Sequence, residues 1–438
     1  MAVSKVAGGL DWIYSLTPTW LRGGRLFSLG FGDVNGSMRY FCKTLAALSR
    51  AGDRPAIAAD VADQIRVLQA PIPLSEGWLP WTSSAVSALP AECLFEIAFP
   101  SPLADQLPLS SQTARALIVF QRSSLDDPYR ADPDISLRHL SSGAKPTDAV
   151  VHMPAFGEQD YAGRLGMARQ IMKERPNSLH IILMAPFYGE RKPPQQSRHY
   201  VLRLADMLVL ANAISAEAAL LVEWSTRMWP RCHAIITGFS FGAAMTSTSA
   251  CLASALLEGK EEQAPVRVSL GVVPCVGSGT PAVVADGVLH GDIDWTLLRS
   301  EFPALQRDQE LLELVTTLND GDEAEANALR DAKTADEFVL NLLRIVDTRK
   351  LVKALHKRWA GNDKVAVRFG SVVAVGAEHD SFVKVAYSEQ LFHALQSVAL
   401  PQRVSFSIVG GGHVAAFIRR ERIFVPAVLR AIHQLDDH

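Results

Sequence analysis

The chain has 438 residues, of which 48% are hydrophobic and 20% charged, and its formal net charge is −3. This composition is typical of a globular protein with a sizeable core, and it excludes a disordered or fibrous chain. Lys and Arg are scattered along the sequence, so it carries no electrostatic footprint for nucleic acid. Five widely spaced cysteines (Cys42, Cys93, Cys232, Cys251 and Cys275) match no zinc motif, so reduced thiols are expected.

Two apolar stretches bear on contact with a membrane. Residues 207–224 are the most apolar, but an asparagine and two glutamates interrupt them, so we expect a buried or amphipathic helix and no transmembrane span. Residues 1–27 contain Asp11 and lack the uninterrupted hydrophobic length of a signal peptide. Their aromatic, leucine and arginine residues allow peripheral membrane contact, although packing on the chain's own domain is the simpler interpretation.

Short β-rich runs alternate with longer helical patterns, which is typical of a mostly parallel sheet covered by helices. The first two strands are expected at 93–102 and 114–123, as an antiparallel pair that opens a mixed sheet, and a polar loop follows over 123–146. The alternation then becomes regular. Strands are predicted at 148–153, 180–186, 232–240 and 266–275, with helices at 162–173, 200–228 and 241–260.

The alternation stops after residue 276, where Leu, Glu, Asp and Lys dominate and the periodicity is helical. We interpret residues 277–365, approximately, as a helical cap inserted into the sheet domain. The predicted organisation is an N-terminal extension over 1–92 that packs on the core, and one α/β domain over 93–438 that contains the cap. After the cap, strands are expected within 369–380 and 403–413, with helices near 388–397 and 420–433.

Residues 236–245 read ITGFSFGAAM and place Ser240 between Gly238 and Gly242, where a predicted strand meets a helix. This is the context of the G-x-S-x-G nucleophile elbow, in which a serine stands on a sharp, strained turn. Its near neighbours must be small because the strand and helix backbones approach each other there. A tight strand–helix junction without catalysis is the alternative. We predict that Ser240 is a nucleophile.

A serine hydroxyl needs a base to take its proton and an acid to orient that base, in the chain order serine, acid, histidine. Among the late histidines, His356 and His433 fall in helical patterns, whereas His413 follows a strand on a glycine-rich loop and is the predicted base. Asp380 follows a predicted strand, at the edge where parallel sheets present functional groups, and is the predicted acid. Glu378 is the alternative. Alone, Asp380 would fit a helix N-cap equally well.

An oxyanion hole would complete this site. One donor is expected to be the backbone N–H of Phe241, directly after the nucleophile, and the other to come from the loop HMPAFGEQDY after an earlier strand. In that loop we prefer Phe156, with Ala155 next.

A second loop, APFYGERKP, also follows a strand and should face the site. Arg191 and Lys192 are predicted to bind an anionic group of the substrate, although solvated charges at the sheet edge would look the same. Tyr188 is predicted to contact substrate, in an apolar aromatic wall suited to an acyl chain. No motif for a nucleotide, a nicotinamide or a metal is present, so no cofactor and no metal site are predicted.

The segments HMPAFGEQDY, APFYGERKP, GFSFGAAM, VPCVGSG, GAEHD and GGGHVAAFI resemble, in order and spacing, the α/β-hydrolase domain-containing protein 18 family. FYGERKP is the most specific of them, and PSPLADQLP and LDWIYSL extend the resemblance to nearly the whole chain. The resemblance implies an α/β-hydrolase fold, a mostly parallel sheet with helices on both faces. It also implies a catalytic triad of Ser240, Asp380 and His413. Ala155 and Ala243 stand where the family tends to have glycine.

The function predicted is hydrolysis of an acyl ester by a serine triad through an acyl-enzyme. The resemblance implies a lipid substrate, with a mitochondrial phospholipid such as cardiolipin proposed for members. It also favours a site role for Arg191 and Lys192. The compartment is open, with an intracellular one favoured and a mitochondrial one implied only by the resemblance. The alternative function is a hydrolase-fold protein that binds lipid or acts as a scaffold without catalysis. Sequence does not separate an esterase from a peptidase or thioesterase.

Overall fold

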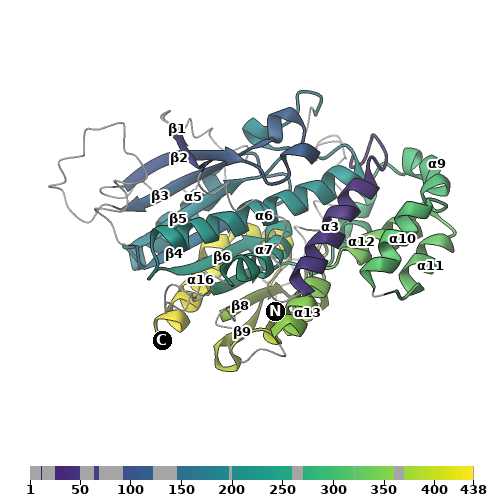
Figure 1. The fold of residues 1–438 in the computed structure, drawn as a ribbon. Helices are drawn as coiled ribbons and strands as arrows, with labels where there is room; N and C mark the ends of the chain where they lie inside the picture. The colour runs from purple at the N-terminus through teal and green to yellow at the C-terminus, as the bar shows by residue number, and fades with distance from the viewer. Residues whose placement is uncertain are drawn as a thin grey trace.

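A nine-stranded sheet forms the centre of the described part of the protein (Figure 1). The computed structural model describes residue 11 and residues 25–49, 64–68, 92–121, 146–196, 200–258, 270–319, 321–359 and 369–437. The strands are β1 (Arg66–Leu68), β2 (Glu92–Pro100), β3 (Thr113–Gln121), β4 (Asp148–Met153), β5 (Ser178–Met184), β6 (His233–Phe239), β7 (Leu270–Cys275), β8 (Phe369–Ala377) and β9 (Val404–Val409).

The strand order is β1-β2-β3-β5-β4-β6-β7-β8-β9. Neighbours from β1 to β5 pair antiparallel, and every later pair is parallel. Both the antiparallel opening pair and the mostly parallel sheet that the sequence predicted are therefore confirmed.

Helices cover both faces of this sheet, which explains why its central strands read as continuous apolar runs. Along β4, Val151 belongs to the large core on the face of α6 and α7, whereas Val150 belongs to the core under α16. The helices are α3 (Val34–Ser49), α5 (Ala162–Glu174), α6 (Leu204–Met228), α7 (Phe241–Leu257), α8 (Val283–Asp286), α9 (Trp295–Leu305), α10 (Gln309–Leu318), α11 (Ala324–Arg330), α12 (Ala335–Ile345), α13 (Thr348–Trp359), α14 (Val385–Gln396), α15 (His413–Ile418) and α16 (Arg420–Asp436).

Helix α6 contains the most apolar stretch of the chain. By length and composition it is the one described helix that could cross a membrane, and 83% of its most apolar stretch is buried inside the protein. Such burial is what the core helix of a globular domain shows. The expectation of a buried helix at this position is confirmed.

Six helices, α8 to α13, lie between β7 and β8, within the range predicted for the cap. In Figure 1, α9 to α12 gather beside one end of the sheet, next to α3. Helix α3 packs on α6, α10 and α13, and β1 pairs with β2, so residues before 92 contribute to the core. The division into an extension, a hydrolase domain and a cap stays a prediction. Residues 1–27, predicted to pack on the chain's own domain, and the polar loop over 123–146 lie almost wholly outside the described residues.

Candidate active site

Ser240 occupies the one-residue turn between β6 and α7. Its backbone has φ 57° and ψ −120°, a conformation that costs a non-glycine residue about 1–3 kcal/mol. Its N–H donates to the carbonyl of Cys275 at 3.0 Å, which anchors the turn to β7. A Cβ at Gly238 would lie 2.5 Å from the Gly242 backbone, and one at Gly242 would lie 2.7 Å from the Pro154 carbonyl oxygen. Both glycines are required because a side chain at either would collide with backbone.

The structure brings His413 and Asp380 to this turn. His413, the first residue of α15, has its Nε2 2.9 Å from Ser240 Oγ and its Nδ1 2.7 Å from Asp380 Oδ2. The other carboxylate oxygen of Asp380 accepts the N–H groups of Phe382 and Val383 at 2.8 and 2.7 Å, so the acid is held in one orientation. Asp380 and His413 are both buried, which strengthens these hydrogen bonds.

The alternative acid, Glu378, does not reach the imidazole. Its side chain is 55% exposed, and its ion-pair partner is His379, with 3.7 Å between Nε2 and Oε2. The ring of His413 is instead flanked by two aromatic rings, Phe239 and Phe382, with centroids at 4.7 and 4.9 Å. The packing of these rings restricts rotation of the imidazole.

The two backbone N–H groups predicted for the oxyanion hole make no hydrogen bond among the described residues. Those of Phe241 and Phe156 donate to no protein acceptor within the described ranges, and their side-chain rings meet edge to face at 5.7 Å. The N–H of Ala155, by contrast, donates to Glu158 Oε2 at 3.0 Å. Of the two loop residues considered as the second oxyanion donor, Phe156 therefore has its N–H available and Ala155 does not.

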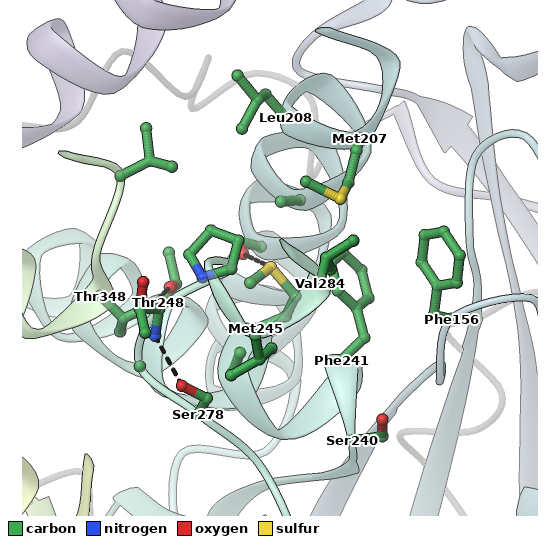
Figure 2. A pocket seen from close by; sticks show the side chains of 18 of the residues that line it. Phe156, Met207, Leu208, Ser240, Phe241, Met245, Thr248, Ser278, Val284 and Thr348 are labelled. Atoms are coloured by element: carbon green, nitrogen blue, oxygen red, sulfur yellow. Dashed lines mark hydrogen bonds between the residues drawn. The ribbon is translucent and has the colours of Figure 1, made fainter. Parts of the chain in front are cut away.

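A cavity of about 90 Å³ lies against Ser240 and opens to solvent. Its walls come from α3, α6, α7 and the segment 278–289, with further residues from the Phe156 loop, the start of α13 and the loop after Asp380. In Figure 2, Ser240 lies at one end and Met207 and Leu208 at the other, with Phe156 and Phe241 between them. The larger apolar residues of the lining are Phe41, Phe156, Met207, Leu208, Phe241, Met245, Val283, Val284, Leu289, Val346, Phe382 and Val383.

Arg191 lies in the core, which corrects its predicted contact with substrate. Its side chain is fully buried, and its guanidinium donates to both carboxylate oxygens of Glu217 on α6 at 2.7 and 2.9 Å. It also donates to the carbonyls of Met184 and Ser111, both at 2.7 Å. Since a buried guanidinium without its carboxylate would be costly, these contacts make Arg191 part of the framework that ties β5 to α6.

Tyr188 and Lys192 do not line the cavity either. Tyr188 is fully buried and packs edge to face on Phe156 with ring centroids 5.9 Å apart, so it supports a cavity residue from behind. Burial raises the pKa of its phenol, which therefore stays protonated. Lys192 is half-buried.

One group of possible metal ligands occurs among the described residues: Asp148, His233 and Asp436, whose ligand atoms lie within 4.8 Å of one another. Asp148 begins β4 and His233 begins β6, so the group lies at the opposite edge of the sheet from Ser240. Arg175 donates to both carboxylates, at 2.9 Å to Asp148 and 2.8 Å to Asp436. The guanidinium already pairs with both carboxylates and offsets part of their charge, so the group is best described as an ion-pair network.

Two features of the site were not predicted. The first is the contribution of α3 and α6 to the cavity, through residues such as Phe41 and Met207. The second is Asp11, whose buried carboxylate contacts the backbone of the histidine loop. The only signal for Asp11 in the sequence is a lone acid inside an apolar segment.

The chain matches the model of a known family. A family model described as "Alpha/beta hydrolase domain containing 18" matches residues 81–434, most of the chain. The chain belongs to this family. For a member of the alpha/beta hydrolase domain containing 18 family, the observed sheet is an α/β-hydrolase fold, and membership supports hydrolysis as the broad class of activity.

Solved structures similar to this family member include acetyl xylan esterase 1 from Thermoanaerobacterium sp., at 9% identity and a TM-score of 0.38, covering 91% of this chain and 96% of the other. Esterase B from Lactobacillus rhamnosis has 12% identity and a TM-score of 0.39, with coverage of 81% and 91%. The acylaminoacyl peptidase of Pyrococcus horikoshii has 10% identity and a TM-score of 0.40, with coverage of 77% and 40%. At these TM-scores the similarities carry no argument about substrate or mechanism.

Proposed function

We propose that the protein is a serine-dependent hydrolase of acyl esters, with Ser240 as nucleophile, His413 as base and Asp380 as the acid that orients it. The observation that carries the proposal is the continuous hydrogen-bond relay from Asp380 through His413 to Ser240. The relay ends at an apolar cavity that has room for part of a substrate. Nucleophile, base and orienting acid in mutual hydrogen-bond contact are what acyl transfer through a covalent intermediate requires.

In the first half of the reaction Ser240 Oγ attacks the ester carbonyl carbon while its proton passes to Nε2 of His413. The carbonyl oxygen becomes an oxyanion, which the N–H groups of Phe241 and Phe156 stabilise. When the tetrahedral intermediate collapses, the C–O bond to the alcohol breaks. Nε2 returns the proton to the leaving alkoxide, and the acyl group stays on Ser240.

In the second half a water molecule replaces the alcohol. Nε2 of His413 takes one proton of the water as its oxygen attacks the acyl carbon, and the same oxyanion contacts form again. Collapse of this intermediate breaks the bond to Oγ, and the proton on Nε2 returns to Ser240. Asp380 accepts the Nδ1–H of His413 throughout and favours the imidazolium that forms twice in the cycle.

The lining of the cavity favours an ester with a hydrocarbon acyl chain. Methionine, leucine, valine and phenylalanine side chains make up much of its lining, and burying a CH₂ group against such a surface contributes about 0.8 kcal/mol. The cavity also favours a second function, lipid binding without catalysis. Lipid binding would use the cavity but would not need the hydrogen-bond relay. Ester hydrolysis and lipid binding are therefore distinguished by whether the protein turns over esters and whether this turnover depends on Ser240.

The experiment is hydrolysis of p-nitrophenyl acetate, butyrate, octanoate and laurate by the wild-type protein and by Ser240→Ala. We expect kcat to fall on the order of 10⁴-fold or more in Ser240→Ala. Ser300→Ala, which removes an exposed serine hydroxyl from α9, is the matched control and should keep wild-type turnover. Undiminished turnover in Ser240→Ala would refute a serine mechanism. Binding of a fatty acid without turnover of any ester by the wild type would favour the lipid-binding function.

A further inference from the structure

Asp11 joins the two loops that carry the base and the acid of the candidate triad. Its Oδ2 accepts the backbone N–H of His413 at 2.9 Å and that of Ser381 at 3.1 Å. Its Oδ1 accepts the N–H of Val414 at 2.9 Å. One carboxylate thus binds the backbone of the base itself and the backbone of the residue that follows Asp380.

This contact is tightly enclosed. Asp11 is fully buried, and a Cβ at Gly412 would lie only 2.5 Å from its Oδ2. Position 412 therefore takes glycine because the carboxylate occupies the space that a side chain would need. One glycine of the run before His413 is therefore explained by contact with Asp11, a residue about 400 positions earlier in the chain.

We propose that Asp11 is a positioning residue for catalysis, whose carboxylate holds the His413 loop and the Asp380 loop at the separation that the Ser240–His413–Asp380 relay needs. This inference rests on the proposed function. Asp11 touches neither the cavity nor the reacting atoms, so its effect is exerted through the backbone of His413 and Ser381.

The physical reason is the sensitivity of acyl transfer to geometry. The relay consists of contacts at 2.7 and 2.9 Å, and a misplacement of the base by about 1 Å costs on the order of a hundredfold in rate. Two backbone contacts between these segments are independent of Asp11: the Glu378 N–H donates to the Val409 carbonyl at 3.0 Å, and the His379 N–H donates to the Gly411 carbonyl at 2.9 Å. Asp11 adds the contacts closest to the catalytic side chains.

A carboxylate suits this task better than its amide. Each of the three contacts is a backbone N–H pointing at an oxygen, and hydrogen bonds to an ionised acceptor are about twice as strong as neutral ones. In Asp11→Asn one oxygen is replaced by an NH₂ group that faces a donor. At least one backbone N–H would lose its acceptor in a buried place, and the loops would separate to relieve it.

The first measurement is steady-state hydrolysis by Asp11→Asn. We expect kcat to fall about ten- to a hundredfold with a much smaller change in KM, because most of the cavity lining lies outside the two loops. Asp148→Asn is the matched control, since it removes another fully buried carboxylate, at the opposite edge of the sheet. It should lower Tm and leave kcat within about twofold. A kcat in Asp11→Asn equal to that of the control would overturn the proposal.

The second measurement separates positioning from general stability by chemical rescue. Asp11→Ala leaves a space that fits a small carboxylate next to the same three N–H groups. Added sodium formate should therefore raise its kcat in a saturable way, whereas sodium chloride should not. Asp11→Asn, whose amide fills that space, and Ser240→Ala should not respond. Loss of activity in Asp11→Ala without any response to formate would count against a local positioning role.

A third measurement does not depend on turnover. Hydrogen exchange at the peptides around Ser381 and His413 should become faster in both in Asp11→Asn. Unchanged exchange in both would contradict the hydrogen bonds by which Asp11 connects the two loops. The two proposals also fail separately. If Ser240→Ala keeps activity, the proposed function is wrong whatever Asp11 does. If Ser240→Ala is inactive and Asp11→Asn is fully active, only the role of Asp11 is wrong.

Discussion

His413 Nε2 lies 2.9 Å from Ser240 Oγ, although 173 residues separate the two along the chain. The sheet accounts for this meeting. Ser240 follows β6, Asp380 follows β8 and His413 follows β9, and these strands run parallel from β6 through β9. Parallel strands end at one edge, where functional groups of open α/β sheets gather. The long separation in sequence becomes a short distance because every connection returns the chain to the same edge.

Removal of the charge on Asp380 should affect turnover far more than removal of the charge on Glu378. In Asp380→Asn the amide no longer fixes the tautomer and orientation of His413, and kcat should fall about 10⁴-fold. In Glu378→Gln, an exposed side chain loses only a weak 3.7 Å contact with His379, and kcat should stay within about twofold. Parallel ester assays of the two variants test the assignment. Equal losses would mean that the acid has been misassigned.

Addition of one methyl group at Gly242 should disrupt the turn that presents Ser240. The Cβ would lie 2.7 Å from the Pro154 carbonyl oxygen, and strain of this kind costs about 1–3 kcal/mol. Gly242→Ala should therefore lower both Tm and kcat, the latter by at least about tenfold, because the oxyanion donors move. Gly291→Ala is the control, since nothing lies within 4 Å of its Cβ. Wild-type kinetics in Gly242→Ala would contradict the close approach.

A larger side chain in the cavity should shorten the acyl chain that the protein accepts. Ala244 on α7 lines the cavity, and Ala244→Phe would fill space beyond Ser240. Loss of room for two methylene groups costs about 1.6 kcal/mol, roughly tenfold in kcat/KM. We expect p-nitrophenyl laurate to lose at least that factor while the acetate ester is unaffected. A uniform loss across all chain lengths would indicate that the acyl chain binds elsewhere.

Two buried histidines should make the fold sensitive to acid. His152 Nε2 and His180 Nδ1 are 2.9 Å apart, and Ser178 Oγ is 2.9 Å from His180 Nε2. Burial lowers the pKa of His180 to about 3, and burial with the neighbouring His180 and Arg164 lowers the pKa of His152 well below its usual range. Both imidazoles are therefore neutral in the folded protein at mildly acidic pH.

Proton binding by the unfolded chain decides whether acid stabilises or destabilises the fold. Below about pH 6.5 the unfolded chain takes up protons at these histidines and the folded protein does not. The free energy of unfolding therefore decreases as the pH is lowered, until the pKa of each histidine in the folded protein is reached. Each histidine contributes up to about 1.4 kcal/mol per pH unit in that window. Urea unfolding at about pH 7 and about pH 5 should show a smaller difference in His180→Asn than in the wild type. An identical pH dependence would contradict the assignment.

The sequence predicted those parts of the site that depend on local geometry. The strand, sharp turn and small-residue helix around Ser240 form a continuous pattern, and His413 and Asp380 each follow a strand with the right chain order. The preference for Phe156 over Ala155 agrees with the hydrogen bond that Ala155 makes to Glu158. Apart from the chain order, each of these inferences needed only neighbours within a few residues.

The parts that sequence missed depend on distant partners. Whether Arg191 faces a ligand or the core is decided by Glu217 on another helix, and no local pattern reveals that pairing. Asp11 is a stronger case, since its hydrogen-bond partners lie 370 to 403 residues away and are backbone N–H groups, which no residue type marks. The part of the cavity wall that α3 contributes also depends on partners far away in the sequence, so no local pattern reveals it.

The most direct test of the account is the site at which a fluorophosphonate probe forms its adduct. The probe reacts with a serine only when a base activates it, so peptide mapping by mass spectrometry identifies the nucleophile without knowledge of the substrate. We predict a single adduct on Ser240 in the wild type, no adduct in Ser240→Ala, and labelling in His413→Ala that is slower by several orders of magnitude. An adduct on another serine, or an undiminished labelling rate in His413→Ala, would contradict the account.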